Sequence, residues 1–188
     1  DHAQALAALE ALEPFGLGYA ERPVPEIEGL ARLREGLARR GLDIKIAADE
    51  SVRKESDPLA VARAGAADLI VVKAQPLGGV RNALRVVREA GLPAVVSSAL
   101  DTSIGLRIGA GLAAALPELP FACGLGTGSL FEVDVASPAY VAVGGELDLR
   151  PVVADPELLR LHRASPERER WWRDRTAAAY RHLPAGDS

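Results

Sequence analysis

The chain has 188 residues, of which 48% are hydrophobic, and it carries a net charge of -4 at pH 7. This composition is typical of one folded domain, or of part of a larger one, and excludes a disordered chain. The acidic balance and the scattered Lys and Arg residues exclude a basic surface for nucleic acid, and the single cysteine, Cys123, excludes an internal disulfide.

The sequence shows neither a signal peptide nor an apolar run of about 18 residues. We therefore expect a cytoplasmic protein that does not contact a membrane. The sequence starts at Asp1 and contains no methionine, so we expect a fragment, or a chain whose earlier residues are not represented.

The first two thirds of the sequence alternate predicted helices and strands. Helices are expected where apolar residues recur every three to four positions between cap residues, prolines or glycines: residues 1–12, 27–40, 57–64, 80–90 and 103–116. Strands are expected at short apolar runs: residues 17–21, 44–48, 69–73, 94–98 and 121–124. Strands recurring about every 25 residues predict a parallel sheet with right-handed crossovers.

Polar residues stand where these predicted strands give way to loops. They are Glu21, Asp49, Lys73, Ser97 and Ser98. Parallel strands bring such side chains to one edge of the sheet, which is where the active sites of TIM-like barrels lie. Five βα units are too few to close an eight-stranded barrel, so the sequence predicts an α/β fold that forms part of one.

The alternation stops after Val133. Residues 140–149 predict an irregular or hairpin-like segment, and residues 155–163 and 165–183 predict helices. Aromatic side chains are expected to pack the last helix onto the barrel: Trp171, Trp172 and Tyr180.

The charged residues at the strand ends allow two interpretations. Glu21 and Asp49 offer hard oxygen ligands that, with a third carboxylate, suit Mg²⁺; alternatively, each caps a helix or pairs with an arginine. Lys73 follows four apolar residues, so its ammonium either acts on a reacting group or is neutralised by Asp49 or Glu50.

Three motifs in order resemble the enolase superfamily, in its muconate-lactonizing-like subgroup. They are Glu21-Arg22-Pro23, then Ala48-Asp49-Glu50-Ser51, then Lys73. The resemblance implies the C-terminal portion of a (β/α)7β TIM-like barrel, with the capping domain and first strands absent. Residues 1–135 are then the barrel part, and residues 136–188 an extension that packs on the barrel or the capping domain.

The resemblance also implies roles for these residues. Glu21 and Asp49 bind Mg²⁺, Glu50 sits behind them, and Lys73 faces the substrate. Two further segments, starting at Ser97 and Gly124, are similar to the o-succinylbenzoate synthase family of actinobacteria. They imply hydroxyl and backbone contacts to a dicarboxylate substrate from Ser97, Ser98, Gly124, Gly126 and Thr127, although glycines are also common in tight turns.

For that family, the implied reaction is the Mg²⁺-dependent dehydration of 2-succinyl-6-hydroxy-2,4-cyclohexadiene-1-carboxylate through an enolate, a step toward menaquinone. Lys73 would stabilise the enolate by its charge. The base lysine of a K-x-K motif and the first aspartate ligand do not occur in this sequence. We therefore expect the N-terminal half of the same protein to complete the site.

Two alternatives stay open. The first is an N-acylamino acid racemase or dipeptide epimerase of the same superfamily, in which Lys73 is the second base. The second is a non-enzymatic α/β binding module, in which the acids and the lysine resemble a phospho-acceptor site.

Overall fold

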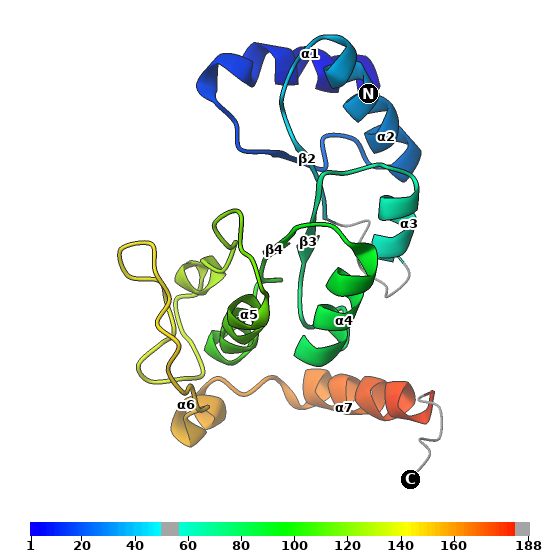
Figure 1. Ribbon diagram of the computed structural model, residues 1–188. Helices are drawn as coiled ribbons and strands as arrows, with labels where there is room; N and C mark the ends of the chain where they lie inside the picture. Colours follow the sequence, from blue (N-terminus) through cyan, green and yellow to red (C-terminus); the bar gives the residue numbers. More distant parts are fainter. Residues whose placement is uncertain (50–56, 183–188) are drawn as a thin grey trace.

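The structure is a computed structural model that describes residues 1–49 and 57–182 (Figure 1). Its elements in chain order are α1 (His2–Leu12), η1 (Glu13–Phe15), β1 (Ala20–Glu21), α2 (Ile27–Arg39), β2 (Ile46–Ala48), α3 (Asp57–Arg63), β3 (Leu69–Val72), α4 (Val80–Ala90), β4 (Ala94–Val96), α5 (Ser103–Ala115), η2 (Thr127–Leu130), α6 (Pro156–Leu161) and α7 (Pro166–Arg181).

The four strands form one parallel sheet in the order β1-β2-β3-β4, and one helix connects each pair of neighbours. Figure 1 shows α2, α3 and α4 along one side of the strands. The strand residues on this side join the helices in the main core. They are Ala20, Ile46, Ala48, Ile70, Val72, Ala94 and Val96. The predicted alternation of helix and parallel strand is confirmed.

The fifth predicted strand, residues 121–124, is wrong in extent. Only Gly124 joins the sheet among these residues, through a parallel bridge to Ser97. The Gly124 N–H donates to the Val96 carbonyl at 2.8 Å, and its carbonyl accepts from the Ser98 N–H at 3.0 Å. Pro120 cannot donate to a ladder, and η2 begins three residues after Gly124, so the extended run ends after one bridge.

The opposite face of the sheet carries a smaller cluster, here termed the inner cluster. It consists of Tyr19, Ala47, Leu69, Val71, Val95 and Phe121. The rings of Tyr19 and Phe121 meet edge to face with centroids 5.0 Å apart. Tyr19 precedes β1 and Phe121 precedes Gly124, so the two rings come from opposite edges, which a flat sheet would separate by about 19 Å. The sheet is therefore curved, with the inner cluster on its concave face.

The C-terminal part lacks sheet structure beyond one hairpin-like bridge between Val143 and Glu146 in the described residues. Helix α7 has no buried residue, and its aromatic side chains are exposed: Trp171, Trp172 and Tyr180. The expectation that they pack α7 onto the barrel is wrong for the described part of the chain. Trp171 instead contacts Trp172 edge to face and lies beneath the guanidinium groups of Arg168 and Arg175.

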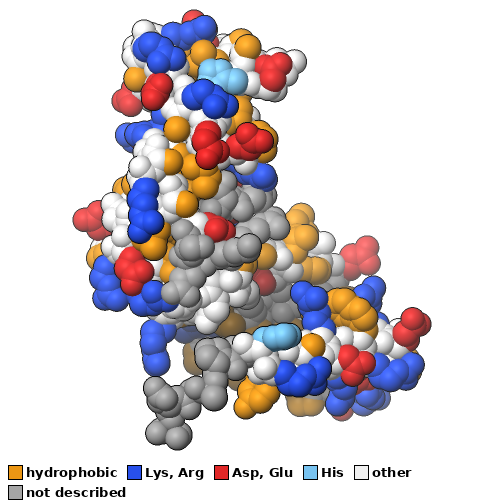
Figure 2. Space-filling view, turned by 90° about the vertical axis from the view of Figure 1, so that its right-hand side faces the viewer, with side chains coloured by type: hydrophobic (Ala, Val, Ile, Leu, Met, Phe, Trp, Pro, Cys, Tyr) orange, Lys and Arg blue, Asp and Glu red, His pale blue; other side chains and the backbone are white. Residues whose placement is uncertain are grey.

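On the face shown in Figure 2, acidic and basic side chains are interspersed rather than gathered by sign. Within residues 1–49 and 57–182, no helix has the length and apolar character that crossing a membrane requires.

Candidate active site

The strand register places Glu21 and Asp49 on the concave face of the sheet. Glu21 of β1 pairs with Ala47 of β2, a member of the inner cluster. Asp49 follows Ala47 by two positions, and side chains in a strand alternate with a period of two. Both carboxylates are thus directed to the same side as the inner cluster, at the carboxyl end of the strands.

The same alternation holds for the next two strands. Lys73 follows Val71 by two positions, and Ser97 follows Val95 by two, while Val71 and Val95 are paired members of the inner cluster. The polar residues of four neighbouring chain segments therefore line one edge of the concave face. This is the arrangement expected of a barrel active site.

Lys73 and Asp49 form an ion pair at this edge. The Lys73 ammonium donates a hydrogen bond to Asp49 Oδ1, and the two side chains are only 20% and 12% exposed. Partial burial strengthens the attraction relative to a surface pair. The pairing of Lys73 with Asp49 that the sequence allowed is therefore present, and this contact fixes the position of the ammonium at the site without excluding that it acts on a reacting group.

Glu21 lies at the first strand, where the backbone turns sharply. The pKa of the Tyr19 phenol is raised above its ordinary value, first by burial and then by the charge of Glu21 and the nearby Cys123.

Arg22, the residue after Glu21, has a φ of 42°, a left-handed conformation that costs a non-glycine residue on the order of 1 kcal/mol. Its N–H donates to the Ala47 carbonyl at 2.9 Å, which holds this turn against β2.

The donor chemistry fits part of a magnesium site. Glu21 and Asp49 supply carboxylate oxygens from neighbouring strands on one face, and Mg²⁺ prefers such ligands. Among residues 1–49 and 57–182, no group of three or more His, Cys, Asp or Glu side chains is placed to hold a metal. Glu50, expected behind the ligands, lies outside the described residues.

The predicted hydroxyl residues come together beside the site. Ser98 Oγ lies 2.8 Å from Thr127 Oγ1 and donates to the Gly124 carbonyl at 3.0 Å. Ser97 Oγ donates to the same carbonyl at 3.3 Å. A Cβ atom at Gly124 would lie 2.9 Å from Ser97 Oγ, so a larger residue there would have to displace the Ser97 hydroxyl. At Gly126, which precedes η2, a Cβ would meet no atom within 4 Å.

Asp134 is a residue that the sequence patterns did not single out. Its carboxylate accepts hydrogen bonds from both the hydroxyl and the N–H of Ser103, at 2.6 and 3.1 Å. The partners are 31 residues apart. An acid in an irregular loop has no periodic pattern that would mark it in the sequence. The one available signal was that the N-terminus of α5 needs a capping group, which would have suggested a partner for Ser103 but not which residue.

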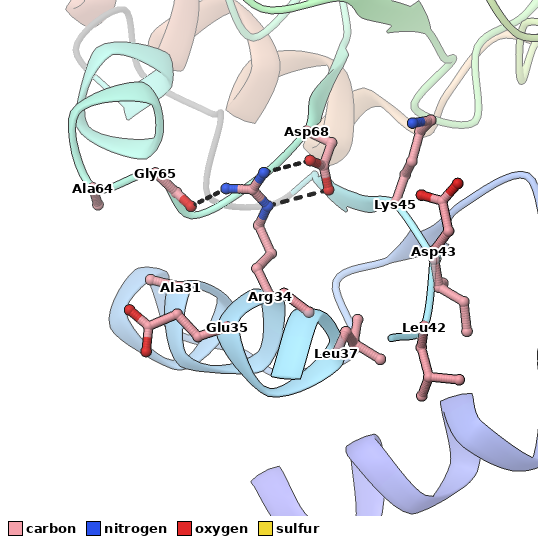
Figure 3. Close-up of a pocket in the computed structure, with 12 residues that line it drawn as sticks. Ala31, Arg34, Glu35, Leu37, Leu42, Asp43, Lys45, Ala64, Gly65 and Asp68 are labelled. Carbon is pink, nitrogen blue, oxygen red and sulfur yellow. Dashed lines mark hydrogen bonds and ion pairs between the residues drawn. The ribbon is translucent and has the colours of Figure 1, made fainter. Parts of the chain in front are cut away.

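A polar pocket of about 480 Å³ lies at the amino ends of β2 and β3, away from these residues (Figure 3). Arg34 Nε donates to Asp68 Oδ2 at 3.1 Å, and the Ile46 N–H donates to the same oxygen at 2.8 Å. Burial raises the pKa of Asp68, but the bonds from Arg34 and Ile46 outweigh it and hold this pKa below its ordinary value. The ion pair between Arg34 and Asp68 joins α2 to the start of β3, so this end of the sheet contributes to stability.

Comparisons with known proteins identify relatives of this chain. Residues 1–152 match the family "Enolase C-terminal domain-like". The chain is 50% identical over 178 residues to o-succinylbenzoate synthase of Mycobacterium marinum, covering 95% of this chain and 52% of the relative. It is 50% identical over 179 residues to that of Mycobacterium tuberculosis H37Rv, covering 95% and 53%. The chain thus spans about half the length of the curated relatives it matches.

Solved structures of muconate enzymes have a similar fold over most of this chain. Muconate lactonizing enzyme from Pseudomonas fluorescens, complexed with muconolactone, superposes with a TM-score of 0.78 and 26% identity over 87% of this chain and 46% of that one. For 2-chloromuconate cycloisomerase from Rhodococcus opacus 1CP, the TM-score is 0.76 and the identity 30% over 88% and 46%. The expected fold, the C-terminal portion of a TIM-like barrel, is confirmed. The chain belongs to the enolase C-terminal domain-like family of the enolase superfamily.

Proposed function

We propose that the complete protein containing this chain is an o-succinylbenzoate synthase, a lyase that dehydrates 2-succinyl-6-hydroxy-2,4-cyclohexadiene-1-carboxylate in the cytoplasm on the route to menaquinone. The observation that carries the proposal is the Lys73–Asp49 ion pair on the same concave face as Glu21 and Ser97. Identity of 50% to synthases over 95% of the chain supports it.

The chemical problem is the removal of a proton next to a carboxylate, which creates a dianionic enolate. A positive charge held in place before the reaction stabilises that anion without reorganisation. Asp49 holds the Lys73 ammonium at the strand edge, which suits it to this role. Mg²⁺, held by Glu21 and Asp49 together with ligands from elsewhere, would supply further positive charge to the substrate carboxylate.

The second carboxylate of the substrate requires donors that add no charge. Ser97 presents its hydroxyl on the concave face, and Thr127 presents another where η2 begins. Gly124 and Gly126 are exposed and have no side chain, so a substrate can approach the backbone there; the Gly124 N–H already donates to the Val96 carbonyl, so Gly124 contributes space rather than a donor. We assign substrate binding to these four residues and to Ser98, which holds Thr127 by its hydroxyl.

The described residues supply one lysine and two carboxylates at this edge, while a proton transfer also needs a base. We infer that the base and a third metal ligand come from the N-terminal half of the same protein. Glu50 would lie behind the two metal-binding carboxylates.

The test is whether the purified complete protein forms o-succinylbenzoate in the presence of Mg²⁺, with chromatography as the measurement. Lys73→Ala should lower kcat by about a hundredfold or more. Lys45→Ala, an exposed lysine before β2, is the matched control and should leave the rate unchanged. Absence of product from the wild-type protein, or full activity of Lys73→Ala, would contradict the proposal.

The geometry does not favour the alternative of a non-enzymatic α/β binding module with a phospho-acceptor site. Such a module gives no role to Glu21 or to Ser97, yet both lie on the face that carries the Lys73–Asp49 pair.

A further inference from the structure

We propose that Asp134 is a positioning residue that holds the hydroxyls of Ser98 and Thr127 in place for the substrate. The inference rests on the proposed function of those two hydroxyls.

Asp134 acts as a non-local cap for α5. The first residue of that helix is Ser103, whose N–H lies 3.1 Å from both Asp134 oxygens. The adjoining N-cap residue, Thr102, makes no side-chain cap hydrogen bond. The first N–H groups of a helix lack partners within the helix and favour a negative charge. The carboxylate that meets this need comes from the loop after η2.

The hydroxyl of Ser103 extends this contact into a chain of hydrogen bonds. It donates to Asp134 Oδ2 at 2.6 Å and accepts from the Tyr140 N–H at 2.6 Å. Ser103 is 0% exposed and Tyr140 is 2% exposed. These hydrogen bonds are linked through the Ser103 hydroxyl. Removing the Asp134 carboxylate would therefore leave the buried hydroxyl and N–H of Ser103 without their acceptor.

Two contacts therefore connect the same two segments. Ser98 meets Thr127 at 2.8 Å, and Ser103 meets Asp134 at 2.6 Å. The segments 98–103 and 127–134 are thus tied at both ends.

Helix η2 lies between the two ties and packs directly on α5. A Cβ atom at Gly128 would come within 2.7 Å of Leu106 Cδ1. Loss of the Asp134 tie would free the end of η2 that is remote from Thr127, and the Thr127 hydroxyl would lose its fixed direction.

The experiment measures KM and kcat of the complete protein after Asp134→Asn. Asn places an amide donor against an N–H donor, so we expect KM to rise about tenfold while kcat changes less than about threefold. Asp155→Asn is the matched control, because Asp155 caps α6 through the N–H groups of Glu157 and Leu158. It should leave both constants unchanged.

A double-mutant cycle separates positioning from general destabilisation. If Asp134 acts through Thr127, then Asp134→Asn adds little to the KM of Thr127→Val. Additive effects on KM, or an unchanged KM with a lower Tm, would overturn the inference. Ser103→Ala keeps the N–H bonds to Asp134 and should raise KM less; it provides the same test if Asp134→Asn does not fold.

Hydrogen exchange makes the two proposals independently testable. Amides of residues 124–130 should exchange faster in Asp134→Asn than in the wild-type protein, whether or not the protein is a synthase. If the wild-type protein makes no o-succinylbenzoate but the amides of residues 124–130 exchange faster in Asp134→Asn, the proposed function is wrong, whereas Asp134 does hold this segment in place. An active wild-type protein whose variant shows unchanged exchange and unchanged KM would refute the positioning role.

Discussion

Lys73 reaches Asp49 across a stagger between neighbouring strands. The register pairs Ala48 with Ile70, so Lys73 stands two positions beyond the residue level with Asp49, a displacement of about 6.6 Å along the strands. The long lysine stem spans that displacement and brings Nζ onto Asp49 Oδ1. The ammonium is thereby directed back over the concave face, toward the carboxylates that are proposed to hold the metal.

Substitutions of Lys73 distinguish a lysine that acts through its charge from one that acts as a catalytic base. In the complete protein, Lys73→Arg should retain a measurable part of the synthase activity, because a guanidinium keeps the charge, whereas Lys73→Ala should not. Proton exchange of an N-acylamino acid in D₂O, followed by NMR, provides the comparison. A racemase would lose exchange on one face of its substrate in both variants, and that pattern would favour the racemase alternative.

Asp49→Asn and Glu21→Gln test the metal assignment. Each removes one charged oxygen ligand, so the Mg²⁺ concentration for half-maximal activity should rise at least tenfold in either variant. Glu89→Gln, on the exposed surface of α4, is the control because its pair with Arg85 is far along the chain from both acids. An unchanged Mg²⁺ requirement in both acid variants would show that these carboxylates do not bind the metal.

Asp68→Asn should destabilise the complete protein by about 1 kcal/mol at pH 7, because the ion pair with Arg34 is lost while its side chains remain partly exposed. The folded-state pKa of Asp68 is lowered, so its stabilisation is present above the unfolded value of about 3.9 and disappears as the pH falls through the folded value. Urea unfolding at pH 7 and near pH 3 measures this change. A difference between variant and wild type that stays constant with pH would contradict the assignment.

Gly124→Ala should displace the Ser97 hydroxyl, because the added Cβ would lie 2.9 Å from Ser97 Oγ. We expect a loss of about 1 kcal/mol in stability and a severalfold higher KM. Thermal unfolding and steady-state kinetics are the measurements. Gly126→Ala serves as the stability control, since its Cβ meets no atom within 4 Å. Equal stability of the two variants would show that Ser97 moves aside without cost.

Local patterns predicted much of the fold. Helix α4 spans Val80–Ala90, the range expected from its apolar spacing and the following Gly91. The strand ends at Glu21 and Lys73 were predictable for the same reason, since a short apolar run that stops at a charge marks the rim of a parallel sheet.

The sequence by itself therefore determined the order of helices and strands and the residues at the strand ends, because these depend on neighbours within a few positions. Only the tertiary structure decided that Asp49 pairs with Lys73, that residues 121–124 contribute a single bridge, and that Asp134 caps α5. Each of these depends on a contact between residues at least 24 positions apart, whose formation is set by strand register and loop packing rather than by any local pattern.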